Sequence, residues 1–286
     1  MTIAWVAATG RARRRFASVS DPVLIASGTF AVLMITIAII GPWIAPHDPD
    51  ATDVLGSLQG PSAQHPLGTD SLGRDILSRA LVAARVSFAG ATMIVVVSAV
   101  LGTALALFSA WHVGGWADRL VNRGLNVMFA VPGILVAVLA AAIFGAGFWA
   151  PVIALGLVYT PYMARVVRSV GVRERHRGYV ESLQLAGMSS WRIAIRHLVP
   201  NVLPIVIAQA TYAFGSALVD FAAISFIGLG IQPPQAEWGV MVADGRSEAL
   251  QGALQQTLVA GTLIVITVVA FNVLGAKLAA RTGGGA

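Results

Sequence analysis

Six apolar stretches of about twenty residues each dominate this chain, and a helix of roughly that length is what crosses the hydrocarbon core of a bilayer. The composition agrees, because 57% of the 286 residues are hydrophobic and only 11% are charged. We therefore predict an all-α polytopic membrane protein with six transmembrane helices. The expected spans are residues 23–45, 88–110, 125–147, 149–168, 201–227 and 257–276.

The basic residues are distributed unevenly between the two sides of these spans. Fifteen of the 19 Lys and Arg residues lie in the N-terminal tail, in the second-to-third link, between residues 165 and 196, or around the end of the last span. Eight of the 13 acidic residues lie on the other side. Because cytoplasmic segments carry an excess of Lys and Arg, we predict that both termini are cytoplasmic.

The segment between the first two spans, from Pro42 to about residue 87, is rich in Pro, Asp and Gly. Its first half is typical of an irregular loop. From Thr69 the pattern favours a helix, capped by Thr69 or Asp70 and supported by an i,i+4 pair between Asp75 and Arg79. We expect this helix to lie along the outer membrane face before the chain turns inward.

No enzymatic chemistry is visible in the sequence. Cysteine is absent, and the five histidines are scattered singly, so we predict neither a disulfide nor a metal site. The one lysine, Lys277, has no Gly-rich phosphate-binding loop before it. No Ser/His/Asp arrangement or HExxH stretch occurs either. We predict a chain without catalytic residues and without a cofactor of its own.

A hydrophilic segment before the fifth span has an unusual spacing: Glu181 is followed six positions later by Gly187, and Pro200 comes thirteen positions after that. This segment resembles the cytoplasmic "EAA" loop of ABC importer permeases, where such subunits receive ATP-driven motion. Ser182 and Leu183 stand where the family pattern has two alanines. Two further motifs, HPLGTDSLGRDILSR at residues 65–79 and SFIGLGIQPP at 225–234 with EWGVM at 237–241, resemble those of the C-type permease of peptide and nickel ABC transporters.

The resemblance implies a type I ABC importer transmembrane core. Residues 1–87 would comprise the cytoplasmic tail, the first span and an extracytoplasmic segment, and residues 88–286 the five-helix domain with a coupling loop at 169–200. The ATPase-coupling residues would be Tyr179, Glu181, Ser182, Leu183, Ala186, Gly187, Arg192 and Pro200. The extracytoplasmic signature residues would be Gly68, Thr69, Asp70, Gly73, Arg74, Asp75, Arg79, Trp238, Gly239, Gly245 and Arg246.

Partners follow from the same resemblance. It implies a heterodimer with a B-type permease, two cytoplasmic ATPase subunits that carry ATP and Mg²⁺, and an extracytoplasmic solute-binding protein that delivers peptide. The location would be the bacterial plasma membrane, and no nucleic acid partner is expected. Nickel chelates, glutathione or another small solute remain alternative substrates.

The coupling segment can also be read from its residues. Tyr179 to about Leu185 can form a short helix, Gly187 allows a turn with positive φ, and a second helical run from Ser190 leads to Pro200 at the start of the fifth span. A short helix rigidly attached to a span can pass on a partner's movement. The alternative is an interfacial amphipathic helix whose arginines stay near anionic lipid.

Asp220 is the one acid inside a predicted span, where a charge is costly and is expected to face the protein interior or a wet path. We predict Asp220 and Gln209 as candidates for the translocation path or gate. Alternatively, Asp220 is a structural partner of Gln209, Thr211, Ser216 or another subunit. A proton-coupled transporter would need an inverted repeat, and a channel would need a pore-lining ring, and neither is evident.

Overall fold

The computed structural model describes residues 21–283. Within that range it is helical, and β structure is limited to an isolated bridge between Thr69 and Asp75. The predicted cytoplasmic tail, with Arg11, Arg13, Arg14 and Arg15, lies outside the described residues. The helices are α1 (Pro22–Ile44), α2 (Ile76–Trp111), α3 (Trp116–Phe129), α4 (Gly133–Phe144), α5 (Trp149–Arg175), α6 (Gly178–Leu185), α7 (Ser190–Ile193), α8 (Val199–Phe226), α9 (Trp238–Ala249) and α10 (Gln255–Gly283), with short 3₁₀ and π turns at Val54–Gly56 and Ala194–Leu198.

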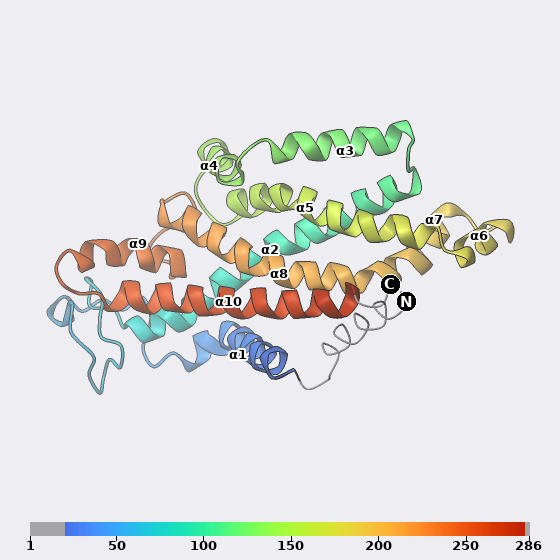
Figure 1. Ribbon diagram of the computed structural model, residues 1–286. Helices are drawn as coiled ribbons and strands as arrows, with labels where there is room; N and C mark the ends of the chain where they lie inside the picture. Colours follow the sequence, from blue (N-terminus) through green and yellow to red (C-terminus); the bar gives the residue numbers. More distant parts are fainter. Residues whose placement is uncertain (1–20, 284–286) are drawn as a thin grey trace, which may run out of the picture.

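Four long helices, α2, α5, α8 and α10, form the centre of an elongated bundle (Figure 1). Helix α2 packs along α5, helix α8 packs along α10, and α1 lies against α2 and α10. Small residues allow these close approaches: a Cβ on Gly102 of α2 would lie 2.7 Å from Cβ of Met163, and one on Gly156 of α5 would lie 2.7 Å from Val97. Such contacts are typical of helix packing in lipid, where small residues bring backbones together.

The prediction of six spans corresponds to five long apolar helices and one bent pair in the described residues. Helix α2 corrects the expected path of the second span. It runs for 36 residues without interruption, so the expected turn inward near residue 87 is wrong. Residues 76–89 contain neither Gly nor Pro to end a helix. Asp75, rather than Thr69 or Asp70, caps α2, and its Oδ2 accepts a hydrogen bond of 2.7 Å from the Ser78 amide.

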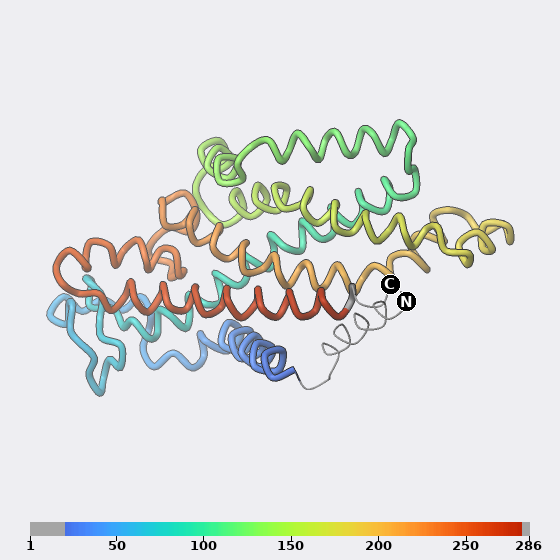
Figure 2. Tube along the Cα trace, viewed as in Figure 1, coloured from blue at the N-terminus to red at the C-terminus, as the bar shows by residue number. Residues whose placement is uncertain are grey.

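The third predicted span, residues 125–147, is not one helix. The structure has α3 and α4 in its place, which meet at an angle of 83° and appear as a sharp corner in the trace (Figure 2). Pro132 explains the break, because proline lacks an amide hydrogen and disfavours helical geometry in the residue before it. The corner places α4 across the bundle beside α5 and α8.

The two ends of the bundle carry different structures. Helices α6 and α7 project from one end, whereas α9 and the loop between α1 and α2 lie at the other (Figure 1). Helix α5 continues to Arg175, so the first part of the predicted 169–200 loop is still helix. The three sequence motifs therefore divide between the ends, with the 181–201 segment at one and the other two motifs together at the opposite one.

Candidate functional site

Helix α6 projects from one end of the bundle, and most of its residues are exposed. Gly187 follows it with φ of +79°, and a Cβ there would meet nothing within 4 Å, so the glycine serves the turn rather than packing inside this chain. Leu185 and Trp191 are large apolar side chains that are 90% and 74% exposed. Among the predicted coupling residues, Tyr179 and Leu183 are partly buried, and Glu181, Ser182, Ala186, Gly187, Arg192 and Pro200 are exposed.

A polar junction fixes α6 to the spanning helices. Oε1 of Glu174, at the end of α5, accepts a 2.9 Å hydrogen bond from the Tyr179 hydroxyl and a 2.7 Å bond from Asn201 Nδ2 of α8. Glu174 also pairs with Arg177 at 3.1 Å. Burial raises the pKa of Tyr179, and the bond to the Glu174 carboxylate adds to that shift, so the hydroxyl stays a neutral donor.

An apolar contact supports the same junction. Val180 of α6, Ile193 of α7 and Leu198 of the π turn are all fully or almost fully buried against one another. Sequence reasoning identified Tyr179 but missed Glu174. The sequence did contain a signal for Glu174, since this residue is an acid among arginines at the end of a span.

Asp118 forms a second junction that the sequence did not reveal. Its carboxylate lies on α3, 2.8 Å from Nη2 of Arg168 on α5, and it accepts a hydrogen bond from Ser109 near the end of α2. Asn122 donates to the same carboxylate at 2.7 Å. One buried acid therefore ties three helices together on the side of the bundle near α6 and α7.

The membrane-embedded acid lies at the corner between α3 and α4. Asp220 Oδ2 accepts a 2.8 Å hydrogen bond from the Tyr159 hydroxyl of α5. Tyr159 is thus the hydrogen-bond partner of Asp220, in place of the expected Gln209, Thr211 or Ser216. Asp220 and Gln209 both line a cavity of about 550 Å³, together with Ser216 and three tyrosines. The tyrosines are Tyr159, Tyr162 and Tyr212.

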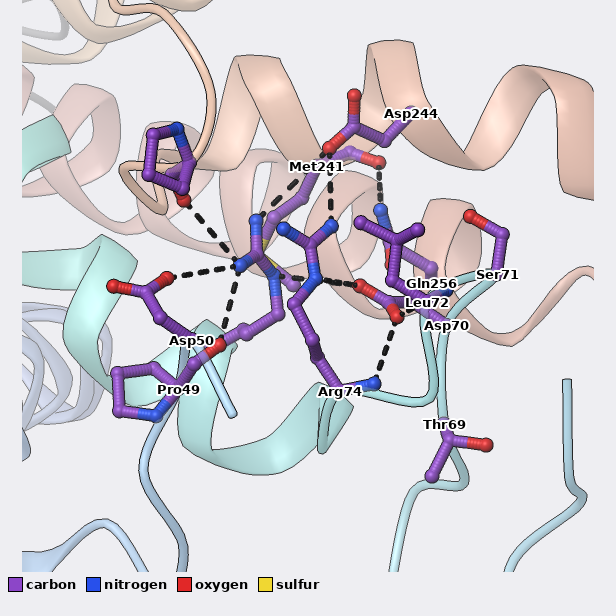
Figure 3. A network of polar contacts seen from close by, with 12 residues as sticks. Pro49, Asp50, Thr69, Asp70, Ser71, Leu72, Arg74, Met241, Asp244 and Gln256 are labelled. Atoms are coloured by element: carbon purple, nitrogen blue, oxygen red, sulfur yellow. Dashed lines mark hydrogen bonds and ion pairs between the residues drawn. The ribbon is translucent and has the colours of Figure 1, made fainter. Parts of the chain in front are cut away.

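At the opposite end of the bundle, the first sequence motif folds into a buried charge network (Figure 3). Arg74 Nε lies 2.6 Å from Asp70 Oδ2, and Arg79 lies 3.7 Å from the same oxygen. Asp244 of α9 approaches both arginines, at 3.7 and 3.9 Å. Burial raises the pKa of Asp244, and the arginines oppose that effect. The network joins the loop before α2 to α9, whose first turn belongs to the second motif.

The second motif packs on α2, just after the first motif, through Trp238 and Glu237. Trp238 is 1% exposed, and its ring nitrogen donates to the Ala80 carbonyl at 3.1 Å. Glu237 Oε1 accepts a 2.7 Å hydrogen bond from the Ser87 hydroxyl of α2. The motif residues therefore form one structural unit. Gly68 and Gly73 adopt positive φ, a Cβ on Gly239 would collide with Ala222, and a Cβ on Gly245 would collide with Thr257. Thr69 is buried, whereas Arg246 is exposed.

One prediction for this end of the molecule is wrong, and the histidines lie closer together in space than their spacing along the sequence indicates. Asp75 and Arg79 do not form the expected i,i+4 pair, because Arg79 turns toward Asp70 and Asp244. The histidines are not all isolated in space. His47 and His65 lie side by side, with ring centroids 4.9 Å apart, and both face Asp75. Burial acts to raise the pKa of Asp75, but hydrogen bonds from Ser78 and His65 hold it below its usual value.

A membrane-spanning helical bundle with an exposed helix fixed to one end is the architecture that the sequence led us to expect of an ABC importer permease. The chain belongs to the family described as the binding-protein-dependent transport system inner membrane component, which matches residues 102–282. The N-terminal transmembrane domain of oligopeptide transport permease C matches residues 9–61. The predicted family and fold class are confirmed.

Relatives agree with this assignment. The glutathione transport system permease protein GsiD of Pectobacterium atrosepticum is 37% identical over 263 residues, which cover 92% of this chain and 86% of the relative. The probable D,D-dipeptide transport system permease protein DdpC of Escherichia coli is 35% identical over 255 residues, or 89% of this chain and 85% of the relative. Both proteins are permease subunits.

Solved structures support the fold. An inward-facing form of the MetNI methionine ABC transporter aligns with a TM-score of 0.53 at 19% identity, covering 71% of this chain and 93% of that chain. A second crystal form of MetNI gives a TM-score of 0.51 at 20% identity, with 68% and 94% covered. At this identity the likeness concerns the fold of the transmembrane core alone.

Proposed function

We propose that this permease imports short peptides across a bacterial plasma membrane, with both termini in the cytoplasm. It would pair with a B-type permease, and each would form half of the path. Two cytoplasmic ATPase subunits would bind and hydrolyse ATP with Mg²⁺, and a solute-binding protein would deliver the substrate. The substrates named for the two relatives, glutathione and D,D-dipeptides, are both short peptides, which supports this substrate class.

One observation carries the coupling proposal: α6 is exposed at the surface of this chain and is fixed to two spans at once. The Glu174 carboxylate holds the Tyr179 hydroxyl and the Asn201 amide, so α6 is tied to both α5 and α8. A partner that grips Leu185 and the surface around Gly187 would move α6 and these two spans together. ATP binding can drive the cycle only if the ATPase pair favours one arrangement of the spans over the other.

The position of Asp220 supports a path beside the α3–α4 corner. The cavity there collects a carboxylate, an amide and several hydroxyl groups in an otherwise apolar bundle. Polar groups at membrane depth are tolerated where they line a cavity or face another subunit. We propose that Asp220 and Gln209 line this subunit's half of the path.

The test is ATPase turnover in proteoliposomes that contain this chain with the B-type permease and ATPase subunits, with and without loaded binding protein. Wild type is compared with Gly187→Trp and with Gly187→Ala. Both variants place a side chain at a position with positive φ, so they share any backbone strain, and only Trp adds a large side chain. A Cβ at this position has no atom of this chain within 4 Å. We expect stimulation by loaded binding protein in wild type, reduced stimulation in the Ala variant and none in the Trp variant. Full stimulation in the Trp variant would exclude this surface as the docking site.

A further inference from the structure

His47, His65 and Asp75 come together from three separate segments at the end of the bundle near α9. His47 follows α1, His65 lies within the first motif, and Asp75 caps α2. His65 Nδ1 is 3.0 Å from Asp75 Oδ1, and His47 Nδ1 is 3.8 Å from Asp75 Oδ2. One ligand atom from each of the three residues lies within 4.8 Å of the other two.

These ligand types select a class of ion. Two imidazole nitrogens and one carboxylate oxygen suit divalent transition ions such as Zn²⁺ and Ni²⁺, whereas Mg²⁺ and Ca²⁺ prefer oxygen ligands. Zinc is held about 2.0 to 2.2 Å from such atoms, so a small inward movement of the imidazoles would bring all three ligand atoms within coordinating distance of one ion. The His47 side chain is 41% exposed, which gives it that freedom and gives an ion a way in from solvent.

The surroundings orient the ligands before any ion binds. Ser78 is central: its hydroxyl and its amide both donate to Asp75 Oδ2 at 2.7 Å, and the same hydroxyl accepts the His47 amide at 3.0 Å. His65 is held in a tight turn, in which its carbonyl accepts the amides of Ser62 and Gly68. Hydrogen bonds of this kind fix metal ligands in protein sites.

Charge also favours a cation at Asp75. Arg79, one turn further along α2, approaches Asp70 and Asp244 instead, so the Asp75 carboxylate is left facing the two imidazoles. We propose that His47, His65 and Asp75 form a binding site for a divalent transition ion of the zinc class. The ion clips the loop between α1 and α2 onto the start of α2.

The test uses the full chain in lipid nanodiscs, stripped with chelator and titrated with Zn²⁺ by calorimetry and with Co²⁺ by visible absorption. The variants are His47→Gln, His65→Gln and the double variant, and His112→Gln is the matched control on an exposed histidine elsewhere. We expect Zn²⁺ to bind to wild type and to the control alike, and Co²⁺ to give ligand-field bands in both. Each single variant should lose at least 100-fold in affinity, and the double variant should not bind.

Ser78→Ala tests the orienting role, because loss of an outer-shell partner typically costs about 10- to 100-fold in metal affinity. Thermal unfolding without metal shows whether each variant is folded. In wild type Zn²⁺ should raise the unfolding temperature, and in the double variant it should not. Failure of wild type to bind Zn²⁺, or unchanged binding by the double variant, would overturn the site and leave the His65–Asp75 contact as a structural hydrogen bond.

Discussion

At the scale of single residues, Arg79 has the most demanding position in the chain. Its side chain is fully buried, and it stands between Asp70, Asp244 and the half-exposed Asp50. Nη1 also donates to the Pro49 and Pro234 carbonyls, at 3.2 and 3.4 Å. Removing one partner of a buried ion pair leaves an uncompensated charge, which typically costs about 3 to 5 kcal/mol.

We therefore predict that Arg79→Met destabilises the protein by an amount in that range. Arg85→Met is the control, because Arg85 is an exposed arginine on the same helix, and we expect it to change stability little. Thermal unfolding in nanodiscs measures both. Equal unfolding temperatures for the two variants would show that the buried network contributes no more than a surface arginine.

The hydrogen bonds of Tyr179 lead to a prediction about the motion of α6. Tyr179→Phe removes the hydroxyl that bonds Glu174 and Asn201, at a cost of about 1 to 2 kcal/mol in local stability. A change of that size alters an opening equilibrium about 5- to 30-fold. We expect amide hydrogen exchange in residues 178–187 to accelerate by that factor, with exchange elsewhere unchanged. Tyr162→Phe, at an exposed tyrosine of α5, should leave the same peptide unaffected.

Substitution of Asp220 can show whether this residue serves the translocation path or only the structure. Asp220→Asn keeps the size of the side chain and can still accept the Tyr159 hydrogen bond, so we expect stability to fall by no more than about 1 kcal/mol. If the charge serves transport, peptide uptake by proteoliposomes should fall about tenfold or more, equivalent to about 1.4 kcal/mol. Loss of stability with unchanged uptake per folded complex would make Asp220 structural.

At the scale of elements, α9 depends on its close approach to α8. A Cβ on Gly239 would collide with the Ala222 backbone, and overpacking of this kind typically costs about 1 to 3 kcal/mol. We predict that Gly239→Ala lowers the thermal stability by that amount. Gly261→Ala is the matched control, since a Cβ there meets nothing within 4 Å and the glycine also lies in a helix. If both variants unfold alike, α9 is not packed on α8 as the structure has it.

Elements differ in how well the sequence predicts them. Both ends of α1 and α8 and the start of α10 lie within two residues of the prediction, because a long apolar run specifies a helix locally, whereas α10 continues seven residues beyond its predicted end. The break at Pro132 and the continuity of α2 were missed. Hydropathy cannot distinguish a span from two helices that share an apolar run, and polar residues at 69–79 suggested a separate surface helix where they are in fact buried together.

The residues of the candidate site also differ in how well the sequence predicts them. Gly187 and Pro200 were identified from their spacing along one segment, and the turn and helix start that they predict are present. Tyr159 and Asp118 were not identified, because each acts through a partner on another helix, and Glu174 was overlooked although it stands among arginines at the end of a span. The pairing of His47 with His65 depends on a loop fold that no local pattern encodes.

At the scale of the whole molecule, one helix connects the two functional ends. The helical run Ser190–Phe226 begins beside α6, passes Asn201 and Asp220, and reaches Ala222, where α9 packs. We therefore expect a displacement of α6 to be transmitted along this continuous helical run toward the cavity at Asp220 and the α9 end of the bundle. This geometry suits a subunit that must change access on both sides of a membrane together.

The orientation of the bundle can be tested directly because the chain contains no cysteine. Ala63→Cys places one thiol in the loop between α1 and α2, and Gln184→Cys places one on α6, both at exposed positions. In spheroplasts, a membrane-impermeant maleimide should label the Ala63 variant, and it should label the Gln184 variant only after the membrane is made permeable. The prediction follows from the excess of Lys and Arg around α6 and the acids at the other end. The reverse labelling pattern would put α6 outside, where no ATPase could reach it, and would contradict the proposed import mechanism as well as the topology.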